Sequence, residues 1–316
     1  TNSAKRDEVM KILITGAAGF LGSNLSKKLL SENHNLLGVD NFFRGSKKNL
    51  PSHENFNFIE QDLLDLEKTK EIFSNYNPEL VIHYAAINGT RYFYDLPHKV
   101  CDENIRMTQN VLEASKLESV KKIIYASSSE VYGPKPIIPT QEDNDIILKS
   151  ISKRDSYASS KALGEFLTFL WAEKNHKKYI IVRPFNTYGK NMVDTKYGQV
   201  IPEFIRRVKD KVDFTIAGDG NQTRSFCHVE DHANILNILI NSVDNEVLNI
   251  GYDEEITILK LAEKIHDNLN RNFDPKFLPE WENDTKWRVP SLTKLRGYIK
   301  DYKFITLEEG LNSVME

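Results

Sequence analysis

The sequence predicts an α/β protein with a doubly wound parallel sheet and a smaller, mixed C-terminal lobe that binds substrate. Up to residue 186, short apolar runs of strand length alternate with stretches of helix length. Strands separated by such helices are typical of right-handed βαβ crossovers and therefore of a parallel sheet. After residue 186 the alternation loosens, and turn-forming residues cluster at 186–189, 218–220 and 283–290.

The elements follow in order along the chain. Strands are predicted at 11–16, 36–40, 55–62, 80–86, 121–129 and 179–186. Those at 11–16 and 80–86 are expected to be buried, because they are apolar, and the one at 179–186 is rich in β-branched residues. Helices are predicted at 21–30, 66–75, 98–116 and 157–174, and then at 198–210, 230–242, 257–270 and 306–315, with a short strand at 246–251.

This order predicts two interleaved domains. Residues 10–185 form the nucleotide-binding domain, to which elements near 229–251 return, and residues 186–228 and 252–316 form the smaller lobe. Residues 1–9 are interpreted as a disordered lead or an expression remnant, because they lack the apolar core of a signal peptide.

The composition excludes several classes of protein. Forty per cent hydrophobic residues in 316 support a large core, and a formal net charge of −3 favours neither nucleic acid nor a membrane surface as partner. No run of about 18 apolar residues occurs. The two cysteines, Cys101 and Cys227, lack metal-ligand spacing, so we expect no metal site, no disulfide framework and a cytoplasmic location.

A glycine-rich turn, TGAAGFLG, follows the first strand. It places Gly16, Gly19 and Gly22 between that strand and the first helix. Glycines at such a turn let the backbone approach a pyrophosphate, and the helix N-terminus offers unpaired N–H groups to the phosphates. Asp40 ends the second strand, 18 residues past Gly22, where a carboxylate accepts hydrogen bonds from the adenosine ribose. The pattern predicts a Rossmann-type site for NAD rather than NADP, with Arg44 interpreted as a solvated loop residue.

A second group of motifs carries the chemistry. Tyr157 and Lys161 are spaced by four residues at the start of a long helix and therefore share one face. An ammonium beside a phenol is expected to lower the pKa of the tyrosine. One crossover earlier, ASSSEVYG (126–133) closes a strand at the carboxyl edge of the sheet, where doubly wound folds bind their ligands. Ser127 to Glu130 are therefore candidates to face the substrate, or alternatively caps of the strand end.

These motifs together resemble those of the extended short-chain dehydrogenases/reductases, specifically the NAD-dependent nucleotide-sugar epimerase/dehydratase family. The matching stretches between residues 15 and 233 are TGAAGFLG, VDNFFRG, QDLLD, HYAA, ENI, ASSSEVYG, YASSK, RPFNTYG and GDGNQTRSFCHVEDHA. DTKWRVPSLTKLRGYI at 284–299 matches more loosely. The resemblance implies NAD as cofactor, a nucleotide-diphosphate sugar as substrate, and a homodimer paired through the helices at 98–116 and 157–174.

The resemblance also implies roles for single residues. Tyr157 would be the general base, Lys161 its modulator and Ser128 the partner of the reacting hydroxyl, with Ser129 and Glu130 beside them. The cofactor-binding candidates are Gly16, Gly19, Phe20, Leu21, Asp40, Asn41, Asp62, Leu63, Ala85, Ala86, Asn104, Tyr157 and Lys161. The substrate-binding candidates are Asn88, Thr90, Arg91, Asn186, Val200, Arg224 and Arg288. Among these, Asn186 and Arg224 would hold the diphosphate, and Arg288 would contact the nucleotide end.

The implied reaction begins with oxidation at C4 of the sugar, a hexose or heptose: Tyr157 removes the hydroxyl proton while hydride leaves for NAD. Release of the 4-keto sugar would make a net 4-dehydrogenase, and its rotation in the pocket a 4-epimerase, in the biosynthesis of surface polysaccharides. The main alternative is UDP-glucuronate decarboxylation, because those enzymes carry Ser–Glu where Ser129–Glu130 stand. Against it, the loop at 86–97, AINGTRYFYDLP, does not match theirs.

Two other outcomes are less favoured. The 4,6-dehydratases carry Asp–Glu at the same place, and Ser129 lacks the acid that would protonate the departing hydroxyl. A non-catalytic NAD-binding protein would be expected to have lost one of Ser128, Tyr157 and Lys161, all of which are present. Arg91, Tyr92 and Tyr94 in the loop at 86–97 are candidates for substrate selection, or for aromatic packing under the loop.

Overall fold

The computed structural model describes residues 8–192, 199–280 and 285–315. Its centre is a seven-stranded sheet in the order β11-β6-β5-β4-β1-β2-β3, in which every neighbouring pair is parallel. The strands are β1 (Lys11–Thr15), β2 (Asn35–Asp40), β3 (Phe56–Glu60), β4 (Leu80–His83), β5 (Lys122–Ala126), β6 (Lys178–Pro184) and β11 (Glu246–Ile250). The order reverses between β1 and β4, which makes the sheet doubly wound and confirms the predicted fold class.

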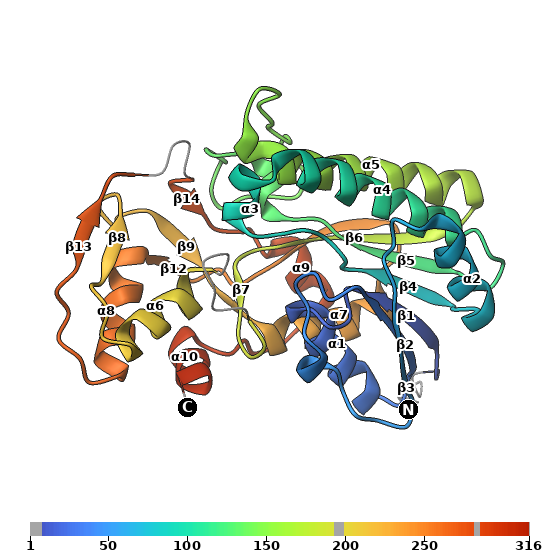
Figure 1. Cartoon of the computed structure of the whole chain (residues 1–316), viewed down its shortest axis with the longest axis horizontal. Coiled ribbons are helices and arrows are strands. Elements are labelled where there is room, and N and C mark those ends of the chain that lie inside the picture. Colours follow the sequence, from blue (N-terminus) through green and yellow to red (C-terminus); the bar gives the residue numbers. More distant parts are fainter. Residues whose placement is uncertain (1–7, 193–198, 281–284, 316) are drawn as a thin grey trace.

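Helices cover both faces of the sheet (Figure 1). On one face lie α2 (Leu66–Tyr76), α4 (Pro97–Ala114) and α5 (Ser156–Asn175), and on the other lie α1 (Phe20–Ser31) and α7 (Val229–Ser242). Alternate residues of β1 therefore enter two cores: Ile12 and Ile14 pack with α1 and α7, whereas Leu13 packs with α2, α4 and α5. Burial on both faces explains why the central strands β1, β4 and β5 are continuous apolar runs in the sequence.

The smaller lobe has a third core of its own and lies at the left of Figure 1. It contains α6 (Val200–Lys209), α8 (Ile258–Asn268) and α10 (Leu307–Met315), with the short strands β8 (Thr215–Ala217), β9 (Thr223–Ser225), β12 (Glu255–Thr257), β13 (Lys276–Leu278) and β14 (Trp287–Arg288). Short pieces join the lobe to the sheet domain: β7 (Thr187–Tyr188), β10 (Cys227–His228) and α9 (Thr293–Tyr298). Between the two parts of the lobe, α7 and β11 return to the large sheet.

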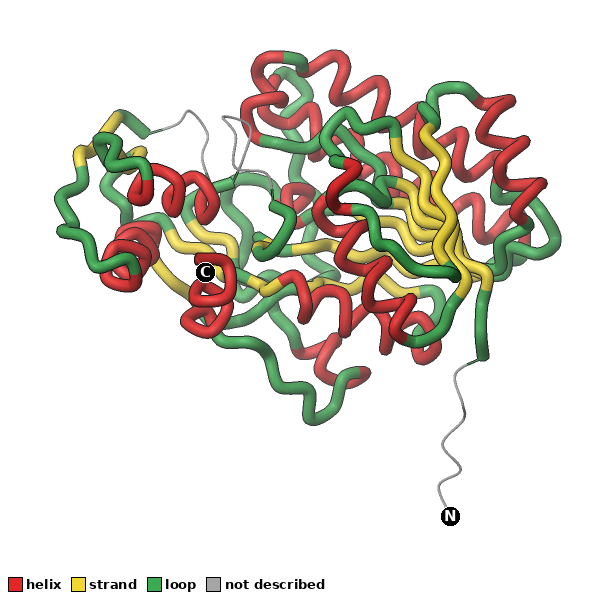
Figure 2. The backbone as a smooth tube through the Cα atoms, turned by 60° about the horizontal axis from the view of Figure 1, so that its bottom comes forward, coloured by secondary structure: helices red, strands yellow, loops and turns green. Residues whose placement is uncertain are grey.

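Several predicted boundaries are wrong. The strands expected at 80–86 and 121–129 end at His83 and Ala126, because the chain leaves the sheet there and its next residues line a cleft. The loop expected at 86–97 contains a helix, α3 (Thr90–Asp95), which buries Phe93 against the sheet domain. Figure 2 shows the loops that gather at this end of the strands. Of the expected lead, residues 1–7 lie outside the described residues, and no described helix is long and apolar enough to cross a membrane.

Candidate active site

One cavity of about 1050 Å³ runs along the carboxyl edge of the sheet and continues between the sheet domain and the smaller lobe. The glycine turn and Asp40 lie towards one end of it, and residues of α6, β8 and β9 line the other. Tyr157 and Lys161 lie between the two. Sequence motifs that are far apart in the chain thus face a single space, as expected for ligand binding in a doubly wound fold.

The glycine turn has no room for side chains. Gly16 has a φ of +71°, and a Cβ there would lie 2.8 Å from the backbone N of Ala85. A Cβ on Gly22 would lie 2.2 Å from the carbonyl oxygen of Gly16. The backbone can therefore fold tightly beneath the N-terminus of α1, which leaves the unpaired N–H groups of that helix open to a pyrophosphate.

Asp40 stands at the end of β2, as predicted. Its carboxylate accepts hydrogen bonds from the backbone N–H groups of Ala18 at 3.0 Å and Phe42 at 2.7 Å. Burial raises the pKa of Asp40, and these hydrogen bonds oppose that rise. Next to it, the amide of Asn41 donates to Asp62 at 3.2 Å. A tight glycine turn with a carboxylate and polar edge beside it fits an adenosine diphosphate, so these residues fit NAD.

The three residues expected to carry the chemistry are brought together at the middle of the cavity. The hydroxyl groups of Ser128 and Tyr157 are hydrogen-bonded to each other. Lys161 Nζ donates to the carbonyl oxygen of Ala126 at 2.7 Å and lies 5.7 Å from the centre of the Tyr157 ring. Ser128 Oγ also accepts from the backbone N–H of Glu130 at 3.2 Å, so this serine caps a short helical turn as well as facing the tyrosine.

The electrostatics of this group differ from the sequence expectation. Burial raises the pKa of Tyr157, and nearby Glu130 raises it further, whereas Ser128 and Arg44 oppose the rise. Burial also lowers the pKa of Lys161 to about 7, against the attraction of Glu165. The expected lowering of the tyrosine pKa by the lysine is therefore wrong for the protein without ligands, because the same dry surroundings disfavour both charges.

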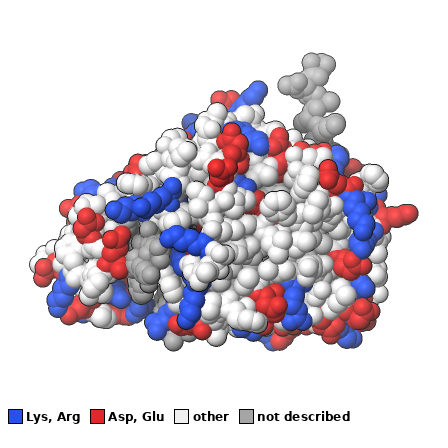
Figure 3. All heavy atoms as spheres, turned by 90° about the horizontal axis from the view of Figure 1, so that it is seen from above, with Lys and Arg blue, Asp and Glu red and all other residues white. Residues whose placement is uncertain are grey.

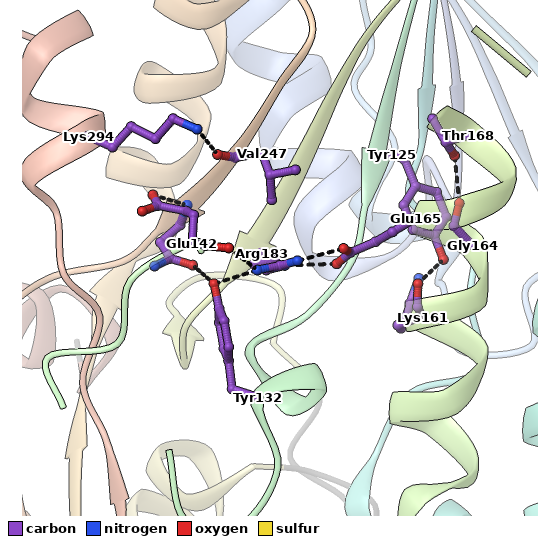
Figure 4. A network of polar contacts seen from close by, with 11 residues as sticks. Tyr125, Tyr132, Glu142, Lys161, Gly164, Glu165, Thr168, Arg183, Val247 and Lys294 are labelled. Atoms are coloured by element: carbon purple, nitrogen blue, oxygen red, sulfur yellow. Dashed lines mark hydrogen bonds and ion pairs between the residues drawn. The ribbon is translucent and has the colours of Figure 1, made fainter. Parts of the chain in front are cut away.

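A buried ion-pair network lies behind Lys161 (Figure 4). Arg183 on β6 binds both carboxylate oxygens of Glu165, at 2.9 and 2.7 Å, and donates to the hydroxyl of Tyr132 at 2.8 Å. Glu165 follows Lys161 by one turn of α5, and the side chains of Arg183, Glu165 and Tyr132 are all buried. The network ties α5 to the sheet and so fixes the helix that carries Tyr157 and Lys161.

A second charged group lies beside Tyr157. Glu130 accepts from Arg288 on β14 at 2.5 Å and from Arg154 at 2.8 Å, the latter from the short 3₁₀ turn Lys153–Asp155 before α5. Burial alone would raise the pKa of Glu130, but the two guanidinium groups lower it to about 2. Arg288 was expected at the nucleotide end of the substrate. In the structure it pairs with Glu130 beside Tyr157, and its expected contact with the nucleotide end stays a prediction.

Two residues at this place were missed by the sequence analysis. The ring of Phe93 stacks on that of Tyr157 with centres 4.9 Å apart and planes at 10°, and the guanidinium of Arg154 lies 5.2 Å from the centre of the Phe93 ring. The position of Arg154 three residues before Tyr157 was a usable signal, since it lies on the approach to the same helix. Arg44, expected to be solvated, is half-buried over the Tyr92 ring.

The other predicted residues divide into those that reach the cavity and one that does not. The lining includes Gly16, Gly19, Phe20, Leu21, Asp62, Leu63, Ala85, Ala86, Ser129, Asn88, Thr90, Arg91, Asn186, Val200 and Arg224. Arg91 is exposed at the rim and pairs with Asp95 at 3.3 Å. Asn104 is not part of the lining. It is buried, and its amide accepts from the backbone N–H of Ile87 at 2.7 Å, so it holds the segment that follows β4.

Comparison with known proteins extends over nearly the whole chain. The model of the NAD dependent epimerase/dehydratase family matches residues 12–251. The UDP-N-acetyl-alpha-D-glucosaminuronate decarboxylase of Bacillus cytotoxicus is 34% identical over 318 residues, which covers 97% of each protein. The UDP-glucose 4-epimerase of Thermotoga maritima, solved with UDP-glucose, has a TM-score of 0.90 at 30% identity and 97% coverage of both chains. The UDP-glucuronic acid 4-epimerase of Bacillus cereus, solved with UDP-glucuronic acid and NAD, has a TM-score of 0.88 at 28% identity, with 97% of this chain and 98% of that chain covered.

Proposed function

Because the chain belongs to the NAD dependent epimerase/dehydratase family and is an NAD-dependent enzyme of the extended short-chain dehydrogenase type, we propose that it oxidises C4 of a nucleotide-diphosphate sugar. Bound NAD supplies the acceptor for the C4 hydride and can return that hydride later in the cycle. Tyr157 takes the proton of the C4 hydroxyl, and Ser128, hydrogen-bonded to it, steadies the oxygen as it becomes a carbonyl.

Lys161 assists the proposed base in this scheme. Its hydrogen bond to the carbonyl oxygen of Ala126 anchors it at the end of β5, where its ammonium favours the phenolate once substrate and cofactor fill the cavity.

The distant diphosphate would be held by Arg224 and Asn186, both of which line the far part of the cavity. Charge-assisted hydrogen bonds to the diphosphate would fix the sugar ring relative to Tyr157.

We further propose that the sugar is a uronic acid and that the net reaction is decarboxylation. The observation that supports this is the Glu130 carboxylate held between Arg154 and Arg288 beside Tyr157. Oxidation at C4 makes the C6 carboxylate a β-keto acid, which loses carbon dioxide while the C5–C6 electron pair forms an enolate. Protonation at C5 and return of the hydride to C4 complete a redox-neutral cycle.

Similarity to the Bacillus cytotoxicus decarboxylase favours this outcome over the release or epimerisation of the keto sugar that was the first expectation. This similarity extends over nearly the whole chain and therefore counts for more than the mismatch between the loop at 86–97 and that of the UDP-glucuronate decarboxylases. A 4-epimerase is the second candidate, because the chain superimposes closely on the Thermotoga maritima epimerase. An epimerase needs the same first step and then a cavity in which the keto sugar turns over.

Product mass after incubation with a panel of UDP-, GDP-, CDP- and dTDP-sugars separates these outcomes. Loss of carbon dioxide from UDP-glucuronate or its N-acetylated analogue is the expected result. An unchanged mass with a new stereochemistry would indicate epimerisation, loss of two hydrogens a net dehydrogenase, and loss of water a dehydratase. Any of these three, without loss of carbon dioxide from a uronate, would contradict the decarboxylase proposal.

We also propose a homodimer formed through α4 and α5. The outer face of α5 exposes Phe166 by 61% and Leu170 by 53%. Figure 3, which views this side of the molecule, shows a broad area without charged side chains between charged margins. Light scattering should give twice the mass of one chain, and Phe166→Glu should give a single chain. A wild-type monomer at micromolar concentration would contradict the proposal.

A further inference from the structure

Two groups compete for the ammonium of Lys161. The first is the place it occupies, where Nζ donates to the carbonyl oxygen of Ala126 at 2.7 Å and lies 5.7 Å from the centre of the Tyr157 ring. The second is the buried carboxylate of Glu165, which lies one turn further along α5 and therefore on the same face of the helix. The negative charge of Glu165 attracts Lys161, yet among the described residues the two form no ion pair.

Arg183 on β6 accounts for this arrangement. Its Nε and Nη2 donate to the two carboxylate oxygens of Glu165 at 2.9 and 2.7 Å. Figure 4 shows the carboxylate turned towards Arg183 in this way. A bidentate arginine–carboxylate pair satisfies the charge and the hydrogen bonding of the acid together. Glu165 therefore keeps its negative charge without drawing on the lysine of its own helix.

Arg183 is itself held by segments outside α5. Its Nη1 donates to the hydroxyl of Tyr132 at 2.8 Å and to the carbonyl oxygen of Glu142 at 3.0 Å. The hydroxyl of Tyr132 donates in turn to Asn249 on β11 at 2.7 Å. The guanidinium thus has a fixed place in the sheet domain, from which it determines where the carboxylate of Glu165 points.

The other titratable groups around the ammonium carry no charge near neutral pH. His83, at the end of β4, is neutral because burial, and then the charge of Lys161, lower its pKa to about 3. Tyr125 on β5, whose ring centre lies 5.0 Å from Nζ, and Tyr157 are neutral because burial raises the pKa of each. Within the described part of the chain, Glu165 is the one acid whose charge acts on this lysine.

We propose that Arg183 is a positioning residue, which binds both oxygens of Glu165 and thereby leaves the ammonium of Lys161 to the proposed base. The inference rests on the proposed oxidation at C4, in which that ammonium must stand beside the tyrosine. Without Arg183, the acid would be buried and unpaired, which is costly. It would then draw the ammonium one turn back along α5 to itself.

The experiment compares NAD-loaded wild type with Arg183→Gln and with the double variant Arg183→Gln/Glu165→Gln. Replacing both partners of a buried ion pair by neutral groups is tolerated far better than removing one partner. The matched control is Tyr302→Phe, which also removes a hydrogen bond to a buried carboxylate, that of Asp231, from a pair that does not line the described cavity.

Two quantities are measured. NMR of isotope-labelled lysine gives the pKa of Lys161 without any substrate, and Lys161→Met identifies its signal. Rapid mixing with UDP-glucuronate gives the rate of NADH formation.

Arg183→Gln should raise the pKa of Lys161, because an unpaired carboxylate stabilises the ammonium. It should also slow NADH formation by about 10- to 100-fold, because the ammonium has left the tyrosine. The double variant should return the pKa of Lys161 to that of the wild type or below it, and the rate to within about three-fold. Tyr302→Phe should change neither quantity, whatever its melting temperature.

An unchanged pKa of Lys161 in Arg183→Gln would overturn the inference, because Glu165 would then have taken up a proton instead. A double variant as slow as Arg183→Gln would overturn it as well, since Arg183 would then act only through the packing of the sheet domain. If Arg183→Gln does not fold, the same criteria apply to Arg183→Lys, which cannot bind both carboxylate oxygens at once. A wild type that forms no NADH contradicts the proposed function, and the pKa of Lys161 then still decides the role of Arg183.

Discussion

The two ends of the cavity are built by different means. At the cofactor end, Gly16 and Gly22 shape the backbone, and Asp40 is held by two backbone N–H groups. At the proposed sugar site beside Tyr157, called the sugar end, charged side chains from distant segments hold one another, as Arg154, Glu130 and Arg288 do. Backbone sterics allow almost no substitution, whereas a charge cluster can be altered by one side chain. The difference explains how one cofactor site can be combined with sugar ends of different specificity.

The largest effect is expected where the two ends meet. Tyr157→Phe removes the proposed base but keeps the ring that stacks on Phe93. The turnover number should fall by roughly 10²- to 10⁴-fold, the usual contribution of a positioned acid–base group, while NAD affinity stays the same. Rapid mixing with UDP-glucuronate and detection of NADH absorbance measures the chemical step. Undiminished NADH formation would show that Tyr157 is not the base.

The cofactor end can be broken by a single methyl group. The Cβ of Gly22→Ala would lie 2.2 Å from the Gly16 carbonyl oxygen. We expect the free energy of unfolding to fall by about 1–3 kcal/mol, as for other overpacked sites, and NAD affinity to fall with it. Gly297→Ala is the control, because a Cβ there would point into open space, and alanine should leave stability unchanged or raise it. Equal effects of both substitutions in urea unfolding would contradict the steric explanation.

The exclusion of water from the site of Tyr157 and Lys161, where the two ends meet, can be measured through the pKa of Lys161. Its pKa is about 7 in the folded chain, below the ordinary value of 10.5, because burial disfavours the ammonium. Between these values the unfolded chain binds more protons than the folded one, so this group makes the fold more stable as pH rises from 7 towards 10.5. Urea unfolding at pH 7 and pH 9 should show a gain of up to about 1.4 kcal/mol per pH unit in the wild type.

Lys161→Met supplies the control for this slope, since it removes the titrating group and leaves every other one. The variant should lack the part of the slope that belongs to the lysine. If the free energy of unfolding of wild type and variant rises equally between the two pH values, Lys161 is not desolvated. The site where the two ends meet would then be no drier than the exposed margin of the cavity.

The smallest effect is expected at the exposed margin of the cofactor end. Asp62 accepts from Asn41 at 3.2 Å and from the backbone N–H of Leu64 at 2.9 Å. Asp62→Ala should weaken NAD binding by about five-fold, equivalent to one ordinary hydrogen bond of about 1 kcal/mol, with no change in the preference for the sugar. Fluorescence titration with NADH measures the cofactor affinity, and product formation from two sugars measures the sugar preference. A changed sugar preference would show that the two ends are coupled.

The cofactor end was predictable because its residues are close in sequence and each has a local reason. A strand, a glycine turn and a helix follow one another within residues 11–31, and Asp40 ends the next strand. The sugar end was predictable only in part. Ser128, Tyr157 and Lys161 were expected from motifs to lie together, as they do, but Arg154 and Phe93 beside them were missed, and the pairing of Arg288 with Glu130 was not expected.

Sequence alone determined the alternation of strands and helices, the parallel sheet and the side of the sheet on which ligands bind. Hydrophobic periodicity and glycine sterics act between near neighbours, so they can be read along the chain. Only the tertiary structure decided which charges meet at Glu130 and how burial shifts the pKa of Tyr157 and Lys161. Ion pairing and desolvation depend on distances and on exclusion of water, and both arise only when segments more than a hundred residues apart, such as Glu130 and Arg288, are packed together.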